Sequence, residues 1–336
     1  MTRCAGILQC PVCDEPLSEV DRSFRCPRGH TFDRAREGYV HLLPAGHGRS
    51  KIRGDTRQMV RARRRFLERG HYEPLSRAIN ALALSHLAGA GASVHHDAEA
   101  GCTHSGEKRE SGSDRVATAP GKMKRGEAVP GAGERLEAAS PAATVLEVGC
   151  GEGYYIGRLA RAVSSSTPDW PSCFIGLDVS KDAVRLAARS YRDVLFLVND
   201  VKHRINVADR RVNVLLDIFA PRNLAEFGRV LRPNGLLIVA IPGEDHLAEL
   251  RERLPLLGIQ PEKRERTIEQ FADGFDLVAQ EALTYPCELE AEETVDLLGM
   301  TPNYWHLDEA TLAAVATWGR TSVTVDVRVL GFRRRG

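Results

Sequence analysis

Short apolar runs alternate with amphipathic stretches along the second half of the chain. The apolar runs predict strands at 145–148, 174–177, 194–198, 212–217 and 236–241. The stretches between them predict a helix that ends near 163 and helices at 181–190 and 224–231. Parallel strands joined by crossover helices form a doubly wound sheet, which binds its ligand at the carboxyl ends of the strands. The pattern therefore predicts an α/β fold with such a site.

The segments on either side of this pattern are expected to extend the same domain. Residues 275–283 and 322–332 are two further strand candidates, which we interpret as a closing, hairpin-like pair of the sheet. Upstream, Asp55 or Thr56 is expected to cap a basic helix, and a second helix is predicted over 72–87.

One long segment does not fit any regular pattern. Residues 89–141 are rich in Gly, Ala, Ser, Glu and Lys and almost lack large apolar side chains. Such a segment cannot bury enough apolar surface to offset the entropy lost on ordering. We therefore expect a disordered insertion here.

Length and charge limit the remaining possibilities. A chain of 336 residues can bury one large core plus a small accessory unit, and its net charge of +1 creates no overall field for an acidic partner. Between Arg49 and Arg69, however, the sequence contains nine Lys or Arg residues and only two acids. This run is either a solvated helix face or a surface that contacts phosphates. No stretch approaches the roughly 18 apolar residues of a membrane span, and no signal peptide is recognisable, so we expect a cytoplasmic protein without membrane contact.

Cysteines near the start of the chain have the spacing of a zinc site. Cys10 and Cys13 are separated by two residues, and Cys26 and His30 follow after a loop. Three thiolates and one imidazole suit a tetrahedral structural zinc ion, which would hold together a segment with almost no core of its own. Cys4 lies outside this spacing and is expected to be an unpaired thiol.

A glycine turn follows the first strand of the predicted sheet. Gly149, Gly151 and Gly153 would let the backbone pass close to a ligand, and Asp178 after the next strand could accept hydrogen bonds from both ribose hydroxyls. A nicotinamide or flavin site could show the same glycines. Glu147 on the strand itself favours the cationic sulfonium of S-adenosylmethionine, and hence a class I, Rossmann-like methyltransferase domain.

Motifs along nearly the whole chain outside residues 89–141 match one known family. They are Cys-Pro-x-Cys with Cys-Pro-x-x-His-x-Phe-Asp, Glu37-Gly-Tyr-Val, Phe66-Leu-x-x-Gly-His-Tyr72, Gly149-Cys-Gly-Glu-Gly-Tyr-Tyr155, Gly176-Leu-Asp-Val-Ser-Lys181, Phe219-Ala-Pro-Arg222, Met300-Thr-Pro and Trp305. In these the chain resembles the RlmA-type 23S rRNA guanine-N1 methyltransferases, which include macrolide-resistance enzymes.

The resemblance implies a set of site residues and partners. It places the zinc ligands at Cys10, Cys13, Cys26 and His30, and cofactor contacts at Tyr72, Gly151, Glu152 and His246. Asp200, after the third strand, is a candidate for adenine contact, with a loop acid as the alternative. The partner would be a 23S rRNA hairpin, and family members can form homodimers.

The resemblance also suggests how the chain is divided. Residues 1–44 would form a zinc-binding module that recognises RNA, and 45–71 a basic helical connector. Residues 72–336 would form the methyltransferase domain, interrupted by the insertion at 89–141.

Methylation at guanine N1 needs a group that removes the N1 proton. Asp217, after the fourth strand, is the acid nearest to the expected target pocket, although the segment departs from the Asn/Asp-Pro-Pro-aromatic motif of amino-group methyltransferases. Two other functions remain open. The fold also serves small-molecule methyltransferases, and a non-catalytic RNA-binding protein could retain it.

Overall fold

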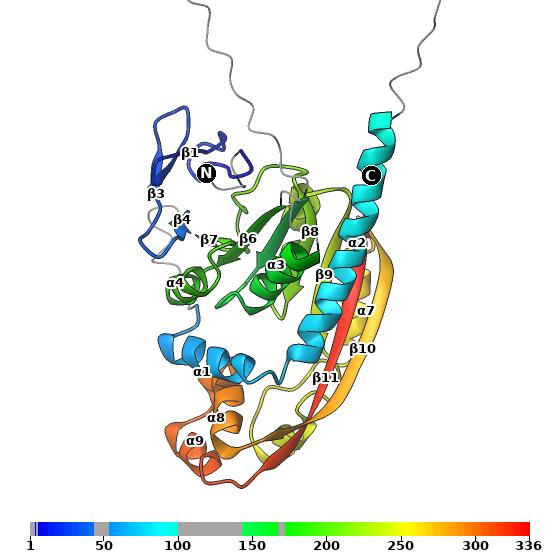
Figure 1. Cartoon of the computed structure of the whole chain (residues 1–336). Coiled ribbons are helices and arrows are strands. Elements are labelled where there is room, and N and C mark those ends of the chain that lie inside the picture. The colour runs from blue at the N-terminus through cyan, green and yellow to red at the C-terminus, as the bar shows by residue number, and fades with distance from the viewer. Residues whose placement is uncertain (1–3, 5, 44–53, 100–142, 167–171) are drawn as a thin grey trace, which may run out of the picture.

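A computed structural model describes residues 4, 6–43, 54–99, 143–166 and 172–336 of the chain. Within these residues the protein forms an eight-stranded mixed sheet and a separate three-stranded sheet near the amino terminus (Figure 1). None of the described helices is both long and apolar enough to cross a bilayer.

The large sheet contains all the strands that the sequence predicts for it. Its strand order is β10-β11-β9-β8-β5-β6-β7-β4. The parallel part includes β5 (Ala143–Val148), β6 (Ser172–Asp178), β7 (Leu195–Val198), β8 (Val212–Ile218) and β9 (Leu231–Pro242). The expected closing pair, β10 (Phe275–Leu289) and β11 (Thr321–Arg334), is antiparallel, and β11 pairs with β9. The predicted doubly wound fold is confirmed.

The strand order reverses next to β5. From β5 the chain adds β6 and β7 on one side, and then β8 and β9 on the other. Loops at the carboxyl ends of β5 and β8 therefore diverge and leave a crevice between them, which is where open α/β sheets bind ligands.

Helices cover both faces of the sheet. One face packs against α2 (Glu73–Glu99), α3 (Tyr154–Ser166) and α4 (Lys181–Ser190). The opposite face packs against α5 (Leu224–Val230), α7 (Lys263–Phe271) and the amino-terminal module. Because strand residues point alternately to the two faces, Val145 belongs to the first core and Leu146 to the second.

A small helical layer closes one end of the sheet. Its members are α1 (Arg57–Glu68), α6 (Ala248–Arg253), α8 (Ala291–Gly299), the 3-10 helix η2 (Pro302–His306) and α9 (Glu309–Val315). In Figure 1, α1, α8 and α9 lie together below the sheet. Thr56 caps α1 by accepting a hydrogen bond from the Met59 amide, as the sequence predicted.

The amino-terminal module shares a core with the large sheet. Its own strands are β1 (Ser18–Val20), β2 (Ser23–Arg25) and β3 (Thr31–Asp33), while β4 (Val40–His41) pairs with β7 as the edge strand of the large sheet. Leu8 and Phe24 are fully buried in the core that contains Leu146. The sequence did not predict β4, because two residues carry no periodicity.

Cys4 is not the unpaired thiol that the sequence analysis expected. It forms a disulfide with Cys173 on β6, 169 residues away. Spacing along the chain could not reveal this pair, since only the packing of the module on the sheet brings the two cysteines together.

The helix α2 is longer than predicted. It continues to Glu99, past residue 89, where the insertion was expected to begin. Residues 100–142, which make up most of that predicted insertion, lie outside the described residues.

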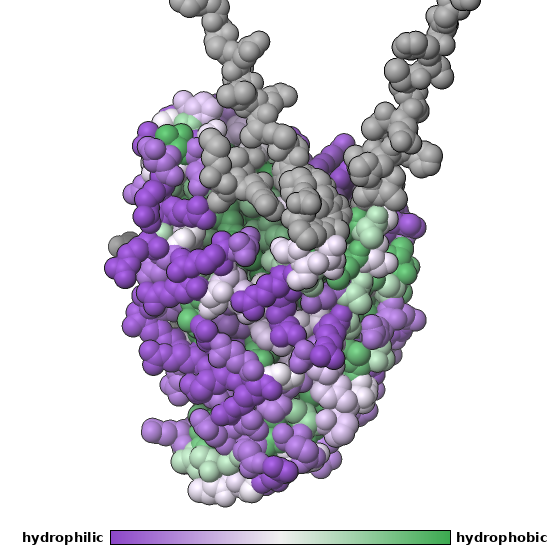
Figure 2. Space-filling view, in the orientation of Figure 1, coloured by the Kyte–Doolittle hydropathy of each residue, from purple (hydrophilic) through white to green (hydrophobic). Residues whose placement is uncertain are grey.

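Most arginines of α1 form ion pairs with acids of the protein, and the phosphate-contact interpretation of the charge run stays a prediction. Polar side chains do gather over α1 and α4 on the face in Figure 2. However, Arg63 pairs with Asp55, Arg64 with Glu68, and Arg65 donates from Nε to Asp296 at 2.9 Å. Most of the charge is therefore neutralised within the protein.

Replacing Arg65 by alanine should destabilise the fold by about 1–3 kcal/mol, because the Asp296 side chain is only 1% exposed and would keep a buried charge without its partner. Thermal unfolding of Arg65→Ala should start at a lower temperature, and Arg65→Ala with Asp296→Asn should recover part of the loss. Arg61→Ala, on the exposed side of the same helix, is the matched control. Equal melting temperatures for the two single variants would contradict the importance of this pair.

Candidate functional site

The four predicted zinc ligands converge on one point. The ligand atoms of Cys10, Cys13, Cys26 and His30 all lie within 4.8 Å of one another. A tetrahedral zinc ion with Zn–S of about 2.3 Å and Zn–N of about 2.1 Å places its ligands about 3.6–3.8 Å apart. The three sulfur atoms lie 3.6, 3.4 and 3.3 Å from His30 Nδ1, and the Cys13 and Cys26 sulfurs are 3.7 Å apart. The donor set and its geometry fit zinc bound through Nδ1, with no open position for catalysis.

The main cavity lies at the carboxyl ends of the parallel strands, beside the switch point. It has a volume of about 730 Å³ and extends from the glycine turn to η2. Single small-molecule sites in proteins occupy about 300–1,000 Å³. The cavity therefore has room for a nucleotide-sized cofactor and for part of a second molecule.

The glycine turn needs its glycines for both conformation and space. Gly149, Gly151 and Gly153 have φ values of 62°, 54° and 83°, in the left-handed region that other residues rarely adopt. A Cβ atom on Gly149 would lie 2.6 Å from Ala220 Cβ, and one on Gly153 would lie 2.8 Å from the Phe196 ring. Gly149 and Gly151 line the cavity, whereas Gly153 does not line it and packs close to the Phe196 ring.

Asp178 and Glu147 organise this turn through backbone amides. Asp178 accepts hydrogen bonds from the Gly151 amide at 3.0 Å and from the Ser180 amide at 2.7 Å. Each carboxylate oxygen retains a free lone pair for a ribose hydroxyl. Glu147 accepts from the Ile156 amide at 3.0 Å, and burial raises its pKa well above the usual range. Both line the cavity, so the predicted contacts with S-adenosylmethionine are sterically open.

An ion cluster that the sequence did not reveal lies against the turn. Arg63 of α1 enters the cavity wall, pairs with Asp55 and donates to the Met300 carbonyl oxygen at 2.8 Å. Burial raises the pKa of Glu152 to about 7, while the Arg63 guanidinium opposes this shift. One Glu152 carboxylate oxygen is buried without a hydrogen-bond partner among the described residues, so it can accept a hydrogen bond from a ligand.

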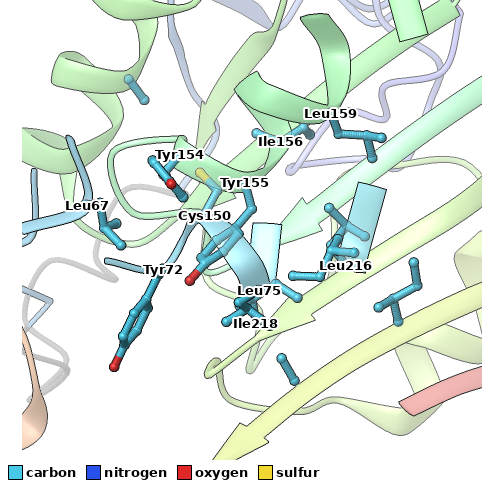
Figure 3. Close-up of a cluster of buried hydrophobic side chains, with 14 of the residues drawn as sticks. Leu67, Tyr72, Leu75, Cys150, Tyr154, Tyr155, Ile156, Leu159, Leu216 and Ile218 are labelled. Carbon is cyan, nitrogen blue, oxygen red and sulfur yellow. The ribbon is translucent and has the colours of Figure 1, made fainter. Parts of the chain in front are cut away.

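Tyr72 and His246 meet on another wall of the cavity. The Tyr72 hydroxyl is 3.4 Å from His246 Nε2, and in Figure 3 this hydroxyl points away from the buried cluster around Leu75. Burial lowers the pKa of His246 to about 4, so its ring is neutral at physiological pH. The Asp326 amide donates to His246 Nδ1 at 3.2 Å, which leaves the ring proton on Nε2 as a donor.

Asp200 and Asp217 occupy different positions relative to the cavity. Asp200 lines it and is held by the Lys202 amide, which donates to its carboxylate at 2.9 Å. Asp217 does not line it, although the following residues 218–222 do. Its buried carboxylate has no hydrogen-bond partner among the described residues, and burial raises its pKa to about 7 while Arg222, 3.5 Å away, opposes the shift.

Most of the sequence-predicted cofactor residues thus surround one cavity. Those lining it are Tyr72, Glu147, Gly149, Gly151, Glu152, Asp178, Asp200 and His246. The sequence analysis missed Arg63 and Lys263, and it gave no role to Phe219 or Trp305, which are 42% and 46% exposed. Phe219 and Trp305 belong to motifs shared with the resembling family, but only the fold shows that both line this cavity.

Comparisons with known proteins agree with both parts of the molecule. Residues 8–51 match the family described as "RlmA, N-terminal", and residues 139–272 match a "Methyltransferase domain". The 23S rRNA (guanine(748)-N(1))-methyltransferase of Streptomyces fradiae is 33% identical over 306 residues, which is 91% of this chain and 88% of the relative. The chain belongs to the RlmA-type 23S rRNA guanine-N1 methyltransferases.

Two further relatives span the same length. A candidate 23S rRNA (guanine-N(1)-)-methyltransferase from Micromonospora griseorubida is 36% identical over 332 residues, 97% of each chain. Another from Bacillus subtilis is 28% identical over 334 residues, 97% of this chain and 96% of the relative. The RlmA resemblance, the S-adenosylmethionine-dependent methyltransferase domain and the Cys3His zinc site are confirmed.

Proposed function

We propose that this protein transfers a methyl group from S-adenosylmethionine to N1 of a guanine in a 23S rRNA hairpin. The observation that carries this proposal is the continuity of the cavity. One cavity is lined both by the glycine turn and Asp178, which suit the methyl donor, and by the exposed aromatic residues Phe219 and Trp305. Donor and acceptor can thus occupy one cavity, where positioning supplies much of the rate enhancement.

The acceptor atom determines what else the site must do. Guanine N1 lies on the Watson–Crick edge and carries a proton, so the base must be unpaired or flipped out, and the proton must be removed. An unpaired hairpin guanine meets the first requirement. The cavity opening next to exposed aromatic side chains is compatible with entry of a single base.

For the proton we propose Asp217 as the acceptor, acting directly or through one water molecule. Asp217 directly precedes the lining residues 218–222 in the chain, and a group with a pKa of about 7 is suited to proton transfer at neutral pH. Because burial raises this pKa, the carboxylate is protonated and inactive as a base below about pH 7.

The rate of methyl transfer should therefore rise with pH up to about 7 and then level off. Asp217→Asn should be slower by on the order of 100-fold and should lose this pH dependence. Single-turnover rates with labelled cofactor between pH 5.5 and 8.5 would measure both effects. Full turnover of Asp217→Asn at neutral pH would eliminate Asp217 as the base.

The function is tested by offering labelled S-adenosylmethionine with naked large-subunit rRNA or with a metabolite extract. We expect label in the RNA, at the hairpin that contains guanine 748, the base named for the Streptomyces fradiae relative. Label only in the metabolite fraction would favour a small-molecule methyltransferase, and no transfer with retained RNA binding would favour a non-catalytic protein.

Three finer points belong to the same proposal. We propose a cytoplasmic location because the proposed substrate is rRNA. The resemblance suggests a homodimer and, through macrolide-resistance members of the family, a role in drug resistance. Analytical ultracentrifugation and macrolide susceptibility with and without the gene test these two points directly.

A further inference from the structure

The described acidic groups of the cavity wall lie on one side of the sheet only, where Arg63 and Lys202 also line the cavity. The acidic lining residues all come from the side of α1 and of β5 to β7, and they are Asp55, Glu147, Glu152, Asp178 and Asp200. On the side of β8 and β9 the charged lining residues are Arg222, Arg251 and Lys263. From residue 218 onward no described acid lines the cavity. The ribose hydroxyls and sulfonium of the methyl donor suit the acidic half, whereas the other half suits an anion.

The protein neutralises these three cations only in part. Lys263 has no carboxylate partner among the described residues, and both burial and the nearby Arg222 charge lower its pKa. Arg251 donates to the Glu244 carbonyl oxygen at 2.6 Å. Arg222 lies 3.5 Å from the buried Asp217, and the charge of Arg251 helps to lower the pKa of Glu249. Positive charges gathered in a half-buried site repel one another, and a bound anion would relieve this repulsion.

An exposed aromatic ring adjoins these cations. Phe219 follows β8, lines the cavity and has a φ of 55°, although a bulky side chain is disfavoured there by about 1–3 kcal/mol. Such conformations concentrate at functional sites. Its ring stacks beside His246, with centroids 6.4 Å apart and an interplanar angle of 24°. With 42% of the residue exposed, a ring face is accessible to a flat ligand.

We propose that Arg222, Arg251 and Lys263 bind the backbone phosphate of the flipped target nucleotide while its guanine stacks on Phe219. The inference rests on the proposed function, because it assigns the half of the cavity lined by cations to the RNA. Single-stranded nucleotides are held in this way, with cations on the phosphate and aromatic rings on the base.

The phosphate contact is tested with Lys263→Ala and a transcript of the 23S rRNA hairpin that contains guanine 748. We expect the KM for this RNA to rise about tenfold, and the slope of log affinity against log salt to fall by about one phosphate contact. The dissociation constant of S-adenosylmethionine, measured by calorimetry, should not change. Lys263→Arg should keep most of the RNA affinity because it keeps the charge.

Arg264→Ala is the matched control. Arg264 is the next residue along α7, but its guanidinium pairs with Glu265 at 2.6 Å and does not line the cavity. It should therefore leave the RNA KM and the salt slope near the wild-type values.

The stacking contact is tested with Phe219→Ala and Phe219→Tyr. Loss of one stacked base is worth about 1–3 kcal/mol, so Phe219→Ala should weaken hairpin binding by tenfold or more. Phe219→Tyr, which keeps the ring, should restore it. Neither variant should alter cofactor affinity.

Two results would overturn the inference. One is an RNA KM and salt slope in Lys263→Ala equal to those of Arg264→Ala. The other is a loss of S-adenosylmethionine affinity in place of RNA affinity, which would assign the cations to the cofactor carboxylate. Binding without cofactor separates this inference from the proposed function. A wild-type protein that binds the hairpin through Lys263 but transfers no methyl group would support the subsite and contradict the activity.

Discussion

Gly149→Ala should lower S-adenosylmethionine affinity and methyl transfer by tenfold or more. The backbone φ of 62° disfavours any Cβ, and the new methyl group would lie 2.6 Å from Ala220 Cβ. Strain of about 1–3 kcal/mol corresponds to roughly a fivefold to 140-fold change in affinity, and the clash with Ala220 adds to it. Relief of the clash would also displace the 219–222 turn, so both the methyl donor and the acceptor base would be misplaced. Calorimetric cofactor binding and steady-state kinetics measure the two effects.

Gly228→Ala is the control for this substitution. Gly228 lies in α5, where an added Cβ meets no atom within 4 Å, and alanine favours a helix. It should leave cofactor affinity and activity unchanged. Wild-type cofactor affinity in a folded Gly149→Ala protein would show that the turn is not the cofactor site.

Cys26→Ser should remove the bound zinc and destabilise the amino-terminal module. Structural zinc contributes about 10–16 kcal/mol of binding free energy in small zinc-binding peptides, and here three ligands would remain in place of four. Because Leu8 and Phe24 of the module share a core with the large sheet, we expect the loss to lower the unfolding temperature of the whole protein. Metal analysis and thermal unfolding measure the two consequences.

Cys287→Ser provides the comparison. Cys287 is buried on β10 and belongs to no ligand cluster among the described residues. This variant should retain one zinc ion per chain. A Cys26→Ser protein that holds zinc as tightly as Cys287→Ser does would contradict the assignment of the four ligands.

The features that sequence revealed correctly depend on local patterns. The zinc ligands lie in two short-spaced pairs, and the glycine turn directly follows an apolar strand that ends at Val148. The strand positions followed from continuous apolar runs, because a parallel strand is buried on both faces. The helix positions followed from amphipathic periodicity. The order of such elements was sufficient to predict the doubly wound fold.

The features that sequence did not reveal depend on distant packing. Arg63 seemed to belong to a solvated or RNA-binding helix face, but the contact between α1 and the glycine turn places it in the cavity wall. The Cys4–Cys173 disulfide and the pairing of β4 with β7 likewise require the module to be docked on the sheet. Asp217 was predicted close to the acceptor; it is buried and does not line the cavity, although residues 218–222, which directly follow it, do.

The central claim is that the cavity brings S-adenosylmethionine to N1 of an rRNA guanine. Its most direct test is primer extension on 23S rRNA from cells with and without the gene, combined with mass spectrometry of the nucleosides. A methyl group at N1 blocks the Watson–Crick edge, so we predict one gene-dependent stop within a hairpin, together with 1-methylguanosine. Identical extension patterns and equal 1-methylguanosine content in both strains would contradict the account.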